Sequence, residues 1–397
     1  MKEMSPRERM LTAYRGGKPD RVPITEMWTH VTYRLAGCLC WMHRLKVAEE
    51  LGWDLHMHLN TVTRPDRGQV NYIYNLGPMM NAQGRSYYEE LDDVRVQLTV
   101  DRKGPMTYVS RVIDTPAGRL QDRIVVPADD AGYGKMAFPD RPERLIKGRD
   151  DLPKIKYLLE VEPPRYQIED AREIIKHVGD RGLVVGTMYS PLDYLLGEAC
   201  QTEDLLTMYY DDRELFRDLL ATFQEYCLRQ TKAYLEIGVQ VFVMTWYCPS
   251  FSVGWSKRIW EELFLPLLKE QVRLLHEYGA VANYYDDGRM RDVLPYLVDA
   301  GVDCAESFVP PPVGNITLKE ARQFVGPGMA LRGGVDNLYA LVLGDRKRIF
   351  EEVERAIHDA GENGGYLLST SDPIPPEAPL ENIKHFIEAG KQFGQYG

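Results

Sequence analysis

The stretch Ala280-Val-Ala-Asn-Tyr-Tyr-Asp-Asp-Gly288 begins as an apolar, strand-like segment and ends in two tyrosines, two adjacent carboxylates and a glycine. Two neighbouring acids at the end of a buried strand must be solvated, paired or protonated. We therefore expect Asp286 and Asp287 to meet a cation, a proton or a hydrogen-bond donor. An ordinary turn that caps the next helix fits the same residues. The ends of the other predicted strands favour the first interpretation, because several of them are also polar.

Eight short apolar segments, each followed by a helical pattern, run along the chain. The predicted strands are 21–28, 53–58, 182–189, 239–246, 280–285, 302–308, 329–335 and 365–371. The predicted helices between and after them are 44–50, 168–177, 203–236, 256–278, 289–299, 317–325, 346–360 and 380–393. This alternation predicts an α/β fold, a (β/α)8 TIM barrel, with a doubly wound open sheet as the alternative. The first strand is not followed by a glycine-rich phosphate-binding motif, which favours the barrel.

Two segments depart from this alternation. Ser5-Pro-Arg-Glu8 is a capping box with proline at the first helical position, which predicts a helix that ends at Gly16-Gly17. After the second strand, residues 94–100, 106–113 and 120–126 alternate with period two, with a tight turn at Thr115-Pro-Ala-Gly118. We therefore expect one barrel domain over residues 1–397, with a β-rich insertion at about 70–154 whose last part, from 127, is a surface connection.

Composition narrows the class of protein. The chain has 397 residues, 44% of them hydrophobic, which is enough for a large core, and its net charge of −11 argues against binding to nucleic acid or anionic membranes. The absence of a run of about 18 apolar residues, and of an apolar signal-peptide core near Met1, predicts a cytoplasmic protein. The six cysteines form no paired framework; Cys38-Leu-Cys40 fits a soft-metal ligand pair or two small apolar residues.

The ends of the eight predicted strands can be compared directly, because reacting groups in a barrel lie where the strands end. They carry carboxylates, histidines and aromatic rings, whereas the nearest basic residues are Arg289 and Arg332. Arg332 is expected to point into a barrel layer or to lie against a carboxylate. The strand ends are Glu26/Trp28/His30, Asp54/His56/His58, Tyr189/Asp193, Trp246/Tyr247/Cys248, Tyr284/Tyr285/Asp286/Asp287, Glu306/Phe308, Asp336 and Asp372.

Several of these residues have a structural interpretation beside the functional one. Trp28 and Trp246 fit core packing as well as substrate contact. His56 and His58 point to the same face of a strand, as two metal ligands do, but a metal site also needs a third ligand.

The two later aspartates are equally open to both interpretations. Asp336 follows Arg332-Gly-Gly-Val, where the glycines allow a sharp turn, so it fits a helix N-cap as well as a site residue. Asp372 precedes Pro373-Ile-Pro-Pro376, a rigid segment that either aims the carboxylate or only turns the chain.

Five motifs together resemble the uroporphyrinogen decarboxylase superfamily over the whole chain, most strongly over residues 1–30 and 255–397. They are Arg7-Glu-Arg-Met-Leu-Thr-Ala-Tyr14 with Pro19-Asp-Arg-Val-Pro23, Tyr285-Asp-Asp-Gly288, Arg332-Gly-Gly-Val-Asp336, Asp372-Pro-Ile-Pro-Pro376 and Glu381-Asn-Ile383. The resemblance implies one of two chemistries on one barrel. They are decarboxylation of a tetrapyrrole, and methyl transfer between a small substrate or coenzyme and a separate corrinoid protein.

The sequence departs from two branches of this superfamily. The decarboxylases carry an arginine-rich segment at the end of the first strand, where this chain has Thr25-Glu-Met-Trp-Thr-His30, so a polycarboxylate would meet Glu26 instead. The thiol-directed methyltransferases bind zinc through a His-x-Cys and a later Cys. Those positions fall on Tyr285, on Asp287, and at or next to Asp372, so a phenol and carboxylates replace the soft ligands.

The resemblance therefore implies a corrinoid-dependent methyltransferase that takes a methyl group from a small methyl ether, expected to be aromatic. A uroporphyrinogen-type decarboxylase and a non-catalytic binding protein are the alternatives. We expect Tyr285 and Asp287 to handle a proton or contact a metal, with Glu26, His30, Asp336 and Asp372 completing the catalytic wall. An aromatic mouth suits a flat aryl ether; its expected substrate-binding residues are Trp28, Tyr189, Trp246, Tyr247, Tyr284 and Phe308. The expected partner is a protein that carries the corrinoid (cobalamin), while a bound metal such as zinc and a homodimer stay open.

Overall fold

The computed structural model describes residues 3–28, 30–36, 40–59, 93–127, 140–161 and 165–396. The chain forms two compact units. The first unit comprises Met1–Gln69, Gln167–Met188 and Thr231–Gly397, and the second comprises Val70–Tyr166 and Tyr189–Gln230. The larger first unit holds most of the predicted barrel.

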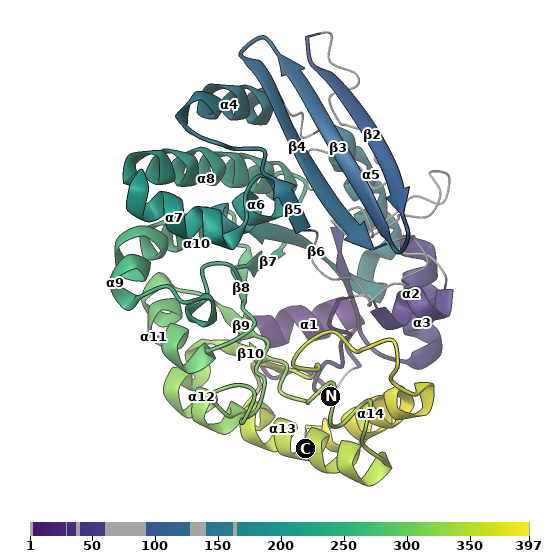
Figure 1. Ribbon diagram of the computed structural model, residues 1–397. Helices are drawn as coiled ribbons and strands as arrows, with labels where there is room; N and C mark the ends of the chain where they lie inside the picture. Colours follow the sequence, from purple (N-terminus) through teal and green to yellow (C-terminus); the bar gives the residue numbers. More distant parts are fainter. Residues whose placement is uncertain are drawn as a thin grey trace. The chain divides into compact units, whose positions relative to one another are not determined.

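A curved parallel sheet forms the centre of the first unit (Figure 1). Its order is β1-β6-β7-β8-β9-β10-β11, so each strand lies beside the next one along the unit. The strands are β1 (Leu55–His58), β6 (Gly182–Tyr189), β7 (Val241–Thr245), β8 (Val281–Tyr285), β9 (Cys304–Glu306), β10 (Ala330–Arg332) and β11 (Tyr366–Leu367). All seven fall within the strands predicted from the sequence.

The first predicted strand, 21–28, closes the barrel as an extended segment between β11 and β1. Thr25 N donates to Leu368 O at 2.9 Å, and Leu368 N donates to Pro23 O at 2.9 Å. On the other side, Asp54 N donates to Ile24 O at 2.7 Å. Pro23 has no N–H to donate, which limits this segment to short pairings. The prediction of a (β/α)8 barrel is confirmed.

Helices connect the strands of the first unit, as the sequence predicts. The predicted helix 256–278 is divided by a π-helical turn, after which Pro266 lacks the N–H that would continue a regular ladder. The helices and 3₁₀ turns are α2 (His30–Ala36), α3 (Trp41–Leu51), α5 (Arg165–Val178), η7 (Gly179–Arg181), η8 (Phe251–Val253), α9 (Lys257–Ile259), η9 (Trp260–Phe264), α10 (Leu265–Glu277), α11 (Met290–Ala300), α12 (Leu318–Val325), η10 (Gly326–Gly328), α13 (Arg346–Gly361) and α14 (Leu380–Phe393).

Helix α1 (Pro6–Tyr14) packs its buried side into the amino end of the barrel. The predicted capping box is present, because Ser5 Oγ accepts from Glu8 N at 3.2 Å and Glu8 Oε2 accepts from Ser5 N at 2.9 Å. Met10 and Tyr14 of α1 belong to the same buried cluster as the alternate, inward residues of the strands. Those strand residues are Leu183, Val185, Val241, Val243, Val281, Tyr285, Cys304, Ala330 and Leu367.

The second unit contains the predicted antiparallel insertion. Its sheet has the order β2-β3-β4-β5, with β2 (Arg95–Lys103), β3 (Met106–Thr115), β4 (Gly118–Pro127) and β5 (Asp140–Glu143). The predicted turn is present, and Thr115 Oγ1 donates to Gly118 O at 2.9 Å. Its helical segments are η6 (Arg149–Asp151), α4 (Leu152–Val161), α6 (Pro191–Glu198), α7 (Thr202–Asp211) and most of α8 (Arg213–Leu235). Within the predicted surface connection, residues 128–139 lie outside the described residues.

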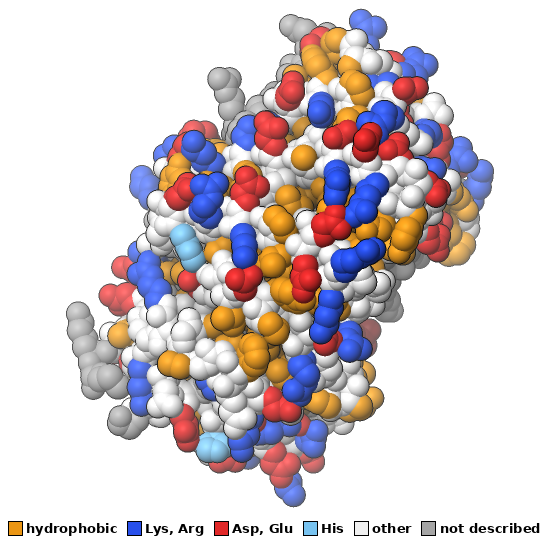
Figure 2. Space-filling model, turned by 90° about the vertical axis from the view of Figure 1, so that its left-hand side faces the viewer, with side chains coloured by type: hydrophobic (Ala, Val, Ile, Leu, Met, Phe, Trp, Pro, Cys, Tyr) orange, Lys and Arg blue, Asp and Glu red, His pale blue; other side chains and the backbone are white. Residues whose placement is uncertain are grey.

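On the face in Figure 2, basic and acidic side chains are interspersed, without a continuous region of either sign. In the part of the chain that the structure describes, none of the helices has the length and apolar character needed to cross a membrane.

Candidate active site

A buried ion pair forms a polar layer inside the barrel. Arg332 Nη1 lies 2.5 Å from Glu306 Oε2, and both side chains are almost completely buried. Asn283 Nδ2 donates to the same carboxylate oxygen at 2.8 Å and lies 3.4 Å from the Tyr14 hydroxyl. Arg332 therefore points into a barrel layer and also lies against a carboxylate, so both expectations for it are confirmed.

The two histidines of β1 lie next to this layer. His56 Nε2 is 2.8 Å from the Tyr14 hydroxyl, and the rings of His56 and His58 are 5.0 Å apart. Burial, followed by the charge of Arg332, holds the pKa of both imidazoles well below the usual value, so they are neutral. Among the described residues, no group of three or more His, Cys, Asp or Glu side chains is arranged to hold a metal ion. His56 and His58 therefore have no third ligand of these types within that part of the chain.

The mouth of the barrel begins with an aromatic pair above this layer. The Trp28 ring stacks on His58 at 4.8 Å and stands edge-on to the Tyr285 ring at 5.6 Å. The indole N–H of Trp28 donates to the Tyr285 hydroxyl, which in turn donates to Asp287. Three residues that the sequence assigned to the site are thus joined by direct contacts.

Two carboxyl groups complete this cluster. Burial raises the pKa of Asp287, although solvent still reaches the side chain, and burial followed by the charge of Asp287 raises the pKa of half-buried Asp372 to about 7. Like charges in one partly buried cluster resist ionising together, so Asp372 keeps its proton up to a pH of about 7. Burial and the charges of both acids raise the pKa of Tyr285 well above its usual value, so it stays a phenol.

The expectation that Asp286 and Asp287 meet hydrogen-bond donors is confirmed. The Tyr284 hydroxyl lies 3.4 Å from Asp286 Oδ2, and Ser307 Oγ lies 3.3 Å from Asp287 Oδ1. The start of α11 has a different partner, because Ser252 Oγ accepts from Arg289 N at 3.2 Å.

Glu26 is occupied by the backbone beside it. Its Oε1 accepts from Val31 N at 2.9 Å and from Thr32 N at 3.2 Å, and its Oε2 accepts from the Thr32 hydroxyl at 2.7 Å. The carboxylate therefore caps the first turn of α2, and burial raises its pKa to about 7. His30 is the first residue of that helix, and its side chain lies outside the described part of the structure.

Asp336 has the capping role that the sequence left open. Its Oδ1 accepts from Leu338 N at 2.8 Å and from Tyr339 N at 2.6 Å, which closes a turn after β10. Both bonds hold local backbone, and the side chain is buried.

Two of the expected substrate-binding aromatics pack in the core instead. Trp246 is fully buried and donates from Nε1 to Gln271 Oε1 of α10 at 3.0 Å, and its ring lies 6.2 Å from the buried Tyr284 ring. Successive residues of a strand face opposite sides, so Tyr284 faces the helices when Asn283 and Tyr285 face the barrel interior. This alternation corrects the expectation that Trp246 and Tyr284 line the mouth.

The other expected aromatic residues are Phe308, Tyr247 and Tyr189. Phe308 is buried just after β9, and Tyr247 is half-buried just after β7. Tyr189 belongs to the second unit, where its ring lies 4.9 Å from Tyr194. In the same unit Ser190 caps α6, because its Oγ accepts from Asp193 N at 3.0 Å and donates to Asp193 Oδ2.

Three residues that contact the cluster or the polar layer below it were not predicted as site residues from the sequence: Ser307, Tyr14 and Asn283. Ser307 holds a left-handed backbone (φ 72°), and its Oγ also lies 2.7 Å from Ser371 O, beside Asp372. An asparagine in the middle of an otherwise apolar strand was the available signal for Asn283. Tyr14 carries no such signal, because it lies on the buried side of a helix.

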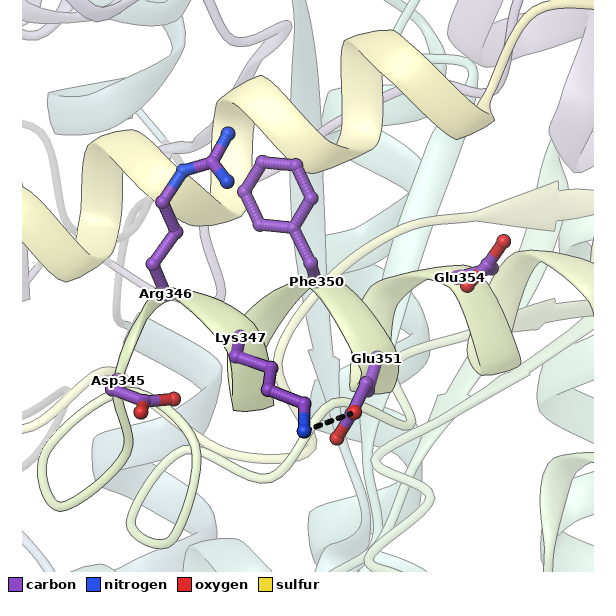
Figure 3. A pocket seen from close by; sticks show the side chains of 6 residues that line it. All are labelled: Asp345, Arg346, Lys347, Phe350, Glu351 and Glu354. Carbon is purple, nitrogen blue, oxygen red and sulfur yellow. Dashed lines mark ion pairs between the residues drawn. The ribbon is translucent and has the colours of Figure 1, made fainter.

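A shallow hollow on α13 (Figure 3) contains none of the predicted site residues. Its cations already have partners, since Lys347 lies 3.8 Å from Glu351 and Arg346 lies 2.8 Å from Glu388. It offers no group of reactive side chains like that at the barrel mouth.

The fold is a (β/α)8 barrel, and the acids at its strand ends form a candidate site at the carboxyl ends of the strands. A family model described as uroporphyrinogen decarboxylase (URO-D) matches residues 123–393. The chain therefore belongs to the uroporphyrinogen decarboxylase family, whose members are enzymes.

Individual proteins agree with this assignment. The chain is 24% identical over 293 residues to a uroporphyrinogen decarboxylase from Gloeobacter violaceus, covering 68% of this chain and 77% of that protein. It is 22% identical over 294 residues to the one from Picrophilus torridus, covering 72% and 82%. Among solved structures, a methyltransferase from Methanosarcina mazei matches with a TM-score of 0.63 and 17% identity, covering 98% of this chain and 99% of that one. This last likeness shows a shared fold.

Proposed function

We propose that this protein transfers a methyl group from a small aromatic methyl ether to the cobalt of a corrinoid held on a separate protein. The reduced cobalt of that partner supplies the nucleophile for the methyl carbon. The bond between the methyl carbon and the ether oxygen breaks, and the oxygen leaves as a phenoxide that needs a proton. The residues of this chain bind the ether and supply that proton.

The observation that carries this proposal is the cluster of Tyr285, Asp287 and Asp372 at the barrel mouth, in which burial and the charge of Asp287 raise the pKa of Asp372 to about 7. An acid whose pKa is near 7 both holds its proton at neutral pH and releases it readily, which suits a general acid. The Tyr285 hydroxyl keeps its proton and donates a hydrogen bond to Asp287, so its role is to orient that carboxyl group, and the carboxyl pair is the proton donor. The proton transfer expected of Tyr285 from the sequence is therefore assigned to Asp287 and Asp372.

The proton balance of this step is complete. The pair begins with one proton, passes it to the phenoxide oxygen as the bond to carbon breaks, and is left as two carboxylates. Like-charge repulsion between Asp287 and Asp372 then favours uptake of a proton from water, to which Asp287 is open. The site is thereby restored for the next substrate.

Aromatic contacts support an aryl donor. One face of Trp28 rests on His58 and its N–H is held by Tyr285, so the indole is a fixed surface at the mouth. A neutral, flat ring packs well on such a surface, and the neutral imidazoles behind it add no charge.

The positions where thiol-directed relatives bind zinc do not fit a soft-metal site here. They hold a phenol that keeps its proton and two carboxyl groups, which are hard oxygen donors. The proposed step therefore uses these side chains for proton transfer and does not depend on a metal held by them.

Decarboxylation of a tetrapyrrole is the second candidate, favoured by the names of the matching relatives from Gloeobacter violaceus and Picrophilus torridus. A substrate with several carboxylates needs unpaired cations. Arg332 already pairs with Glu306 inside the barrel, and the described mouth presents Asp287 and Asp372. These charges favour the methyl-transfer proposal.

Two parallel assays separate the candidates. In the first, the protein is mixed with cobalt(I) cobalamin, free or on a carrier protein, and a panel of methoxylated aromatics, and the cobalt absorbance is followed. In the second, uroporphyrinogen is supplied without cobalamin and carbon dioxide is measured. Methyl transfer predicts a donor-dependent change of the cobalt spectrum only. Carbon dioxide release with no spectral change for any donor would favour the decarboxylase, and no turnover in either assay would favour a binding protein.

A further inference from the structure

Trp28 has a backbone conformation that a tryptophan rarely adopts. Its φ of 57° lies in the left-handed region, where the side chain crowds its own backbone. Such conformations persist only where the surrounding structure enforces them, and they concentrate at functional sites. The contacts on both sides of Trp28 identify what enforces this one.

Arg332 contacts each of the three residues that precede Trp28. Its Nε lies 3.2 Å from Thr25 Oγ1, its Nη2 donates to Glu26 O at 2.9 Å, and its Nη1 lies 3.8 Å from Met27 Sδ. These contacts reach from β10 to the closing segment of the barrel. The remaining strong contact of the guanidinium is the ion pair with Glu306, which fixes its position and balances its charge.

Glu26 fixes the chain on the other side of Trp28. Its carboxylate accepts two backbone N–H groups and one hydroxyl from Val31 and Thr32, so it closes a loop that has Trp28 within it. The backbone of Glu26 is held by Arg332 and its side chain is held by α2. Trp28 thus sits between two anchored points.

We infer that Arg332 and Glu26 are positioning residues that force Trp28 into its left-handed conformation and so hold its indole against Tyr285. Arg332 thereby acts on the substrate surface through Trp28, although its own guanidinium is buried below the mouth. Glu26 acts through the same residue, which replaces the catalytic role expected of it from the sequence. The consequence for catalysis rests on the proposed function, whereas the conformational control of Trp28 does not.

The first test compares glycine with alanine at position 28. Glycine adopts a positive φ freely and alanine does not, so Trp28→Gly should unfold with an equilibrium constant roughly 2- to 10-fold lower than that of Trp28→Ala. When Arg332 is replaced by lysine, the guanidinium hydrogen bonds to Thr25 and Glu26 are lost. Residue 28 can then relax to a negative φ. In this background Trp28→Ala should be more stable than Trp28→Gly, because glycine loses more backbone entropy on folding.

The second test follows the indole itself. The difference in fluorescence between the protein and its Trp28→Phe variant isolates the emission of Trp28. In Arg332→Lys this difference spectrum should shift to longer wavelength and become more sensitive to acrylamide, because the ring leaves His58 and Tyr285. Both tests work without any methyl donor, so a failure of the proposed methyl transfer would leave their outcomes interpretable.

The matched control is Arg111→Lys in the second unit. Arg111 forms an equally buried ion pair with Asp122, bonded through Nε to Oδ1 at 2.8 Å. This variant should lower the stability of the protein. It should leave Trp28→Gly more stable than Trp28→Ala, and it should leave the Trp28 emission unchanged. If Arg332→Lys does not fold, Thr25→Val removes one of the gripped groups more gently and should give the same changes to a smaller extent.

The inference would be overturned if, in folded Arg332→Lys or Thr25→Val, the ratio of the unfolding equilibrium constants of Trp28→Gly and Trp28→Ala stayed the same and the Trp28 emission did not change. Arg332 would then only support the barrel. A change of the same size in Arg111→Lys would overturn it as well, because loss of stability alone would then explain the effect.

Discussion

Replacing Asp372 by asparagine is expected to stabilise the protein at high pH while it impairs catalysis. Burial, followed by the charge of Asp287, raises the pKa of Asp372 from 3.8 to about 7. Because the folded-state pKa is the higher one, the folded protein keeps a proton that the unfolded chain releases in this window. The free energy of unfolding therefore falls as the pH rises from 3.8 to about 7, and stays lowered above it.

The size of the effect follows from the same values. A rise of the pKa from 3.8 to about 7 corresponds to roughly 4 kcal/mol. Asp372 is half-buried, so solvent screens part of this energy. We expect Asp372→Asn to raise the free energy of unfolding by about 1 to 3 kcal/mol at pH 8, and by less than half as much at pH 5. Urea titrations at both pH values, followed by circular dichroism, measure the difference.

Asp336→Asn is the matched control. Asp336 holds two backbone N–H groups through one oxygen, and an asparagine oxygen can accept the same bonds. Its substitution should change stability by no more than about 0.5 kcal/mol, equally at both pH values. The account of the acid pair is refuted if Asp372→Asn destabilises the protein at pH 8, or changes stability equally at pH 5 and pH 8.

Three further predictions concern the same site. Methyl transfer should slow above a pH of about 7, where Asp372 loses its proton, and Asp287→Asn should move this decline to lower pH by lowering the pKa of Asp372; pH–rate profiles check both statements. Tyr285→Phe should lower kcat about 10- to 100-fold with little change in Tm, because it removes a hydroxyl bonded on two sides and keeps the ring; turnover and thermal melting measure this. Asn283→Leu should lower the free energy of unfolding by about 1 to 3 kcal/mol in urea titration, because Glu306 loses a buried donor.

Each of these has a clear contrary result. A pH–rate profile that is the same for Asp287→Asn and the original protein would mean that the two carboxyl groups titrate independently. A full-rate Tyr285→Phe variant would remove the phenol from the site. An Asn283→Leu variant with unchanged stability would show that Glu306 is satisfied by Arg332 alone.

The sequence was sufficient for the barrel, because each of its strands and helices carries a local signal. Strand 182–189 and helix 380–393 have the same bounds in the structure as in the prediction. The closing segment 21–28 was harder to predict, since its backbone hydrogen bonds to the neighbouring strands go to one residue on each side, Leu368 and Asp54. Pairings of that kind depend on residues far away in the chain, and no local pattern encodes them.

The grouping of four candidate residues could be predicted from the order of the strands. Trp28, Tyr285, Asp287 and Asp372 come together because parallel strands end at one edge, which sequence order alone implies. The direction of each side chain was the part that could not be derived without knowing the phase of the strand. Tyr284 and Tyr285 are chemically alike in the sequence, yet one faces the helices and the other the barrel.

The most direct test of the central claim varies the leaving group. The rate of methyl transfer to cobalt(I) cobalamin is measured for a series of aryl methyl ethers whose phenols differ in acidity, with the original protein and with Asp372→Asn. If the acid pair protonates the departing oxygen, the loss caused by the substitution should grow from little for the most acidic phenols to about 100-fold or more for the least acidic. The same loss for every donor would contradict the account.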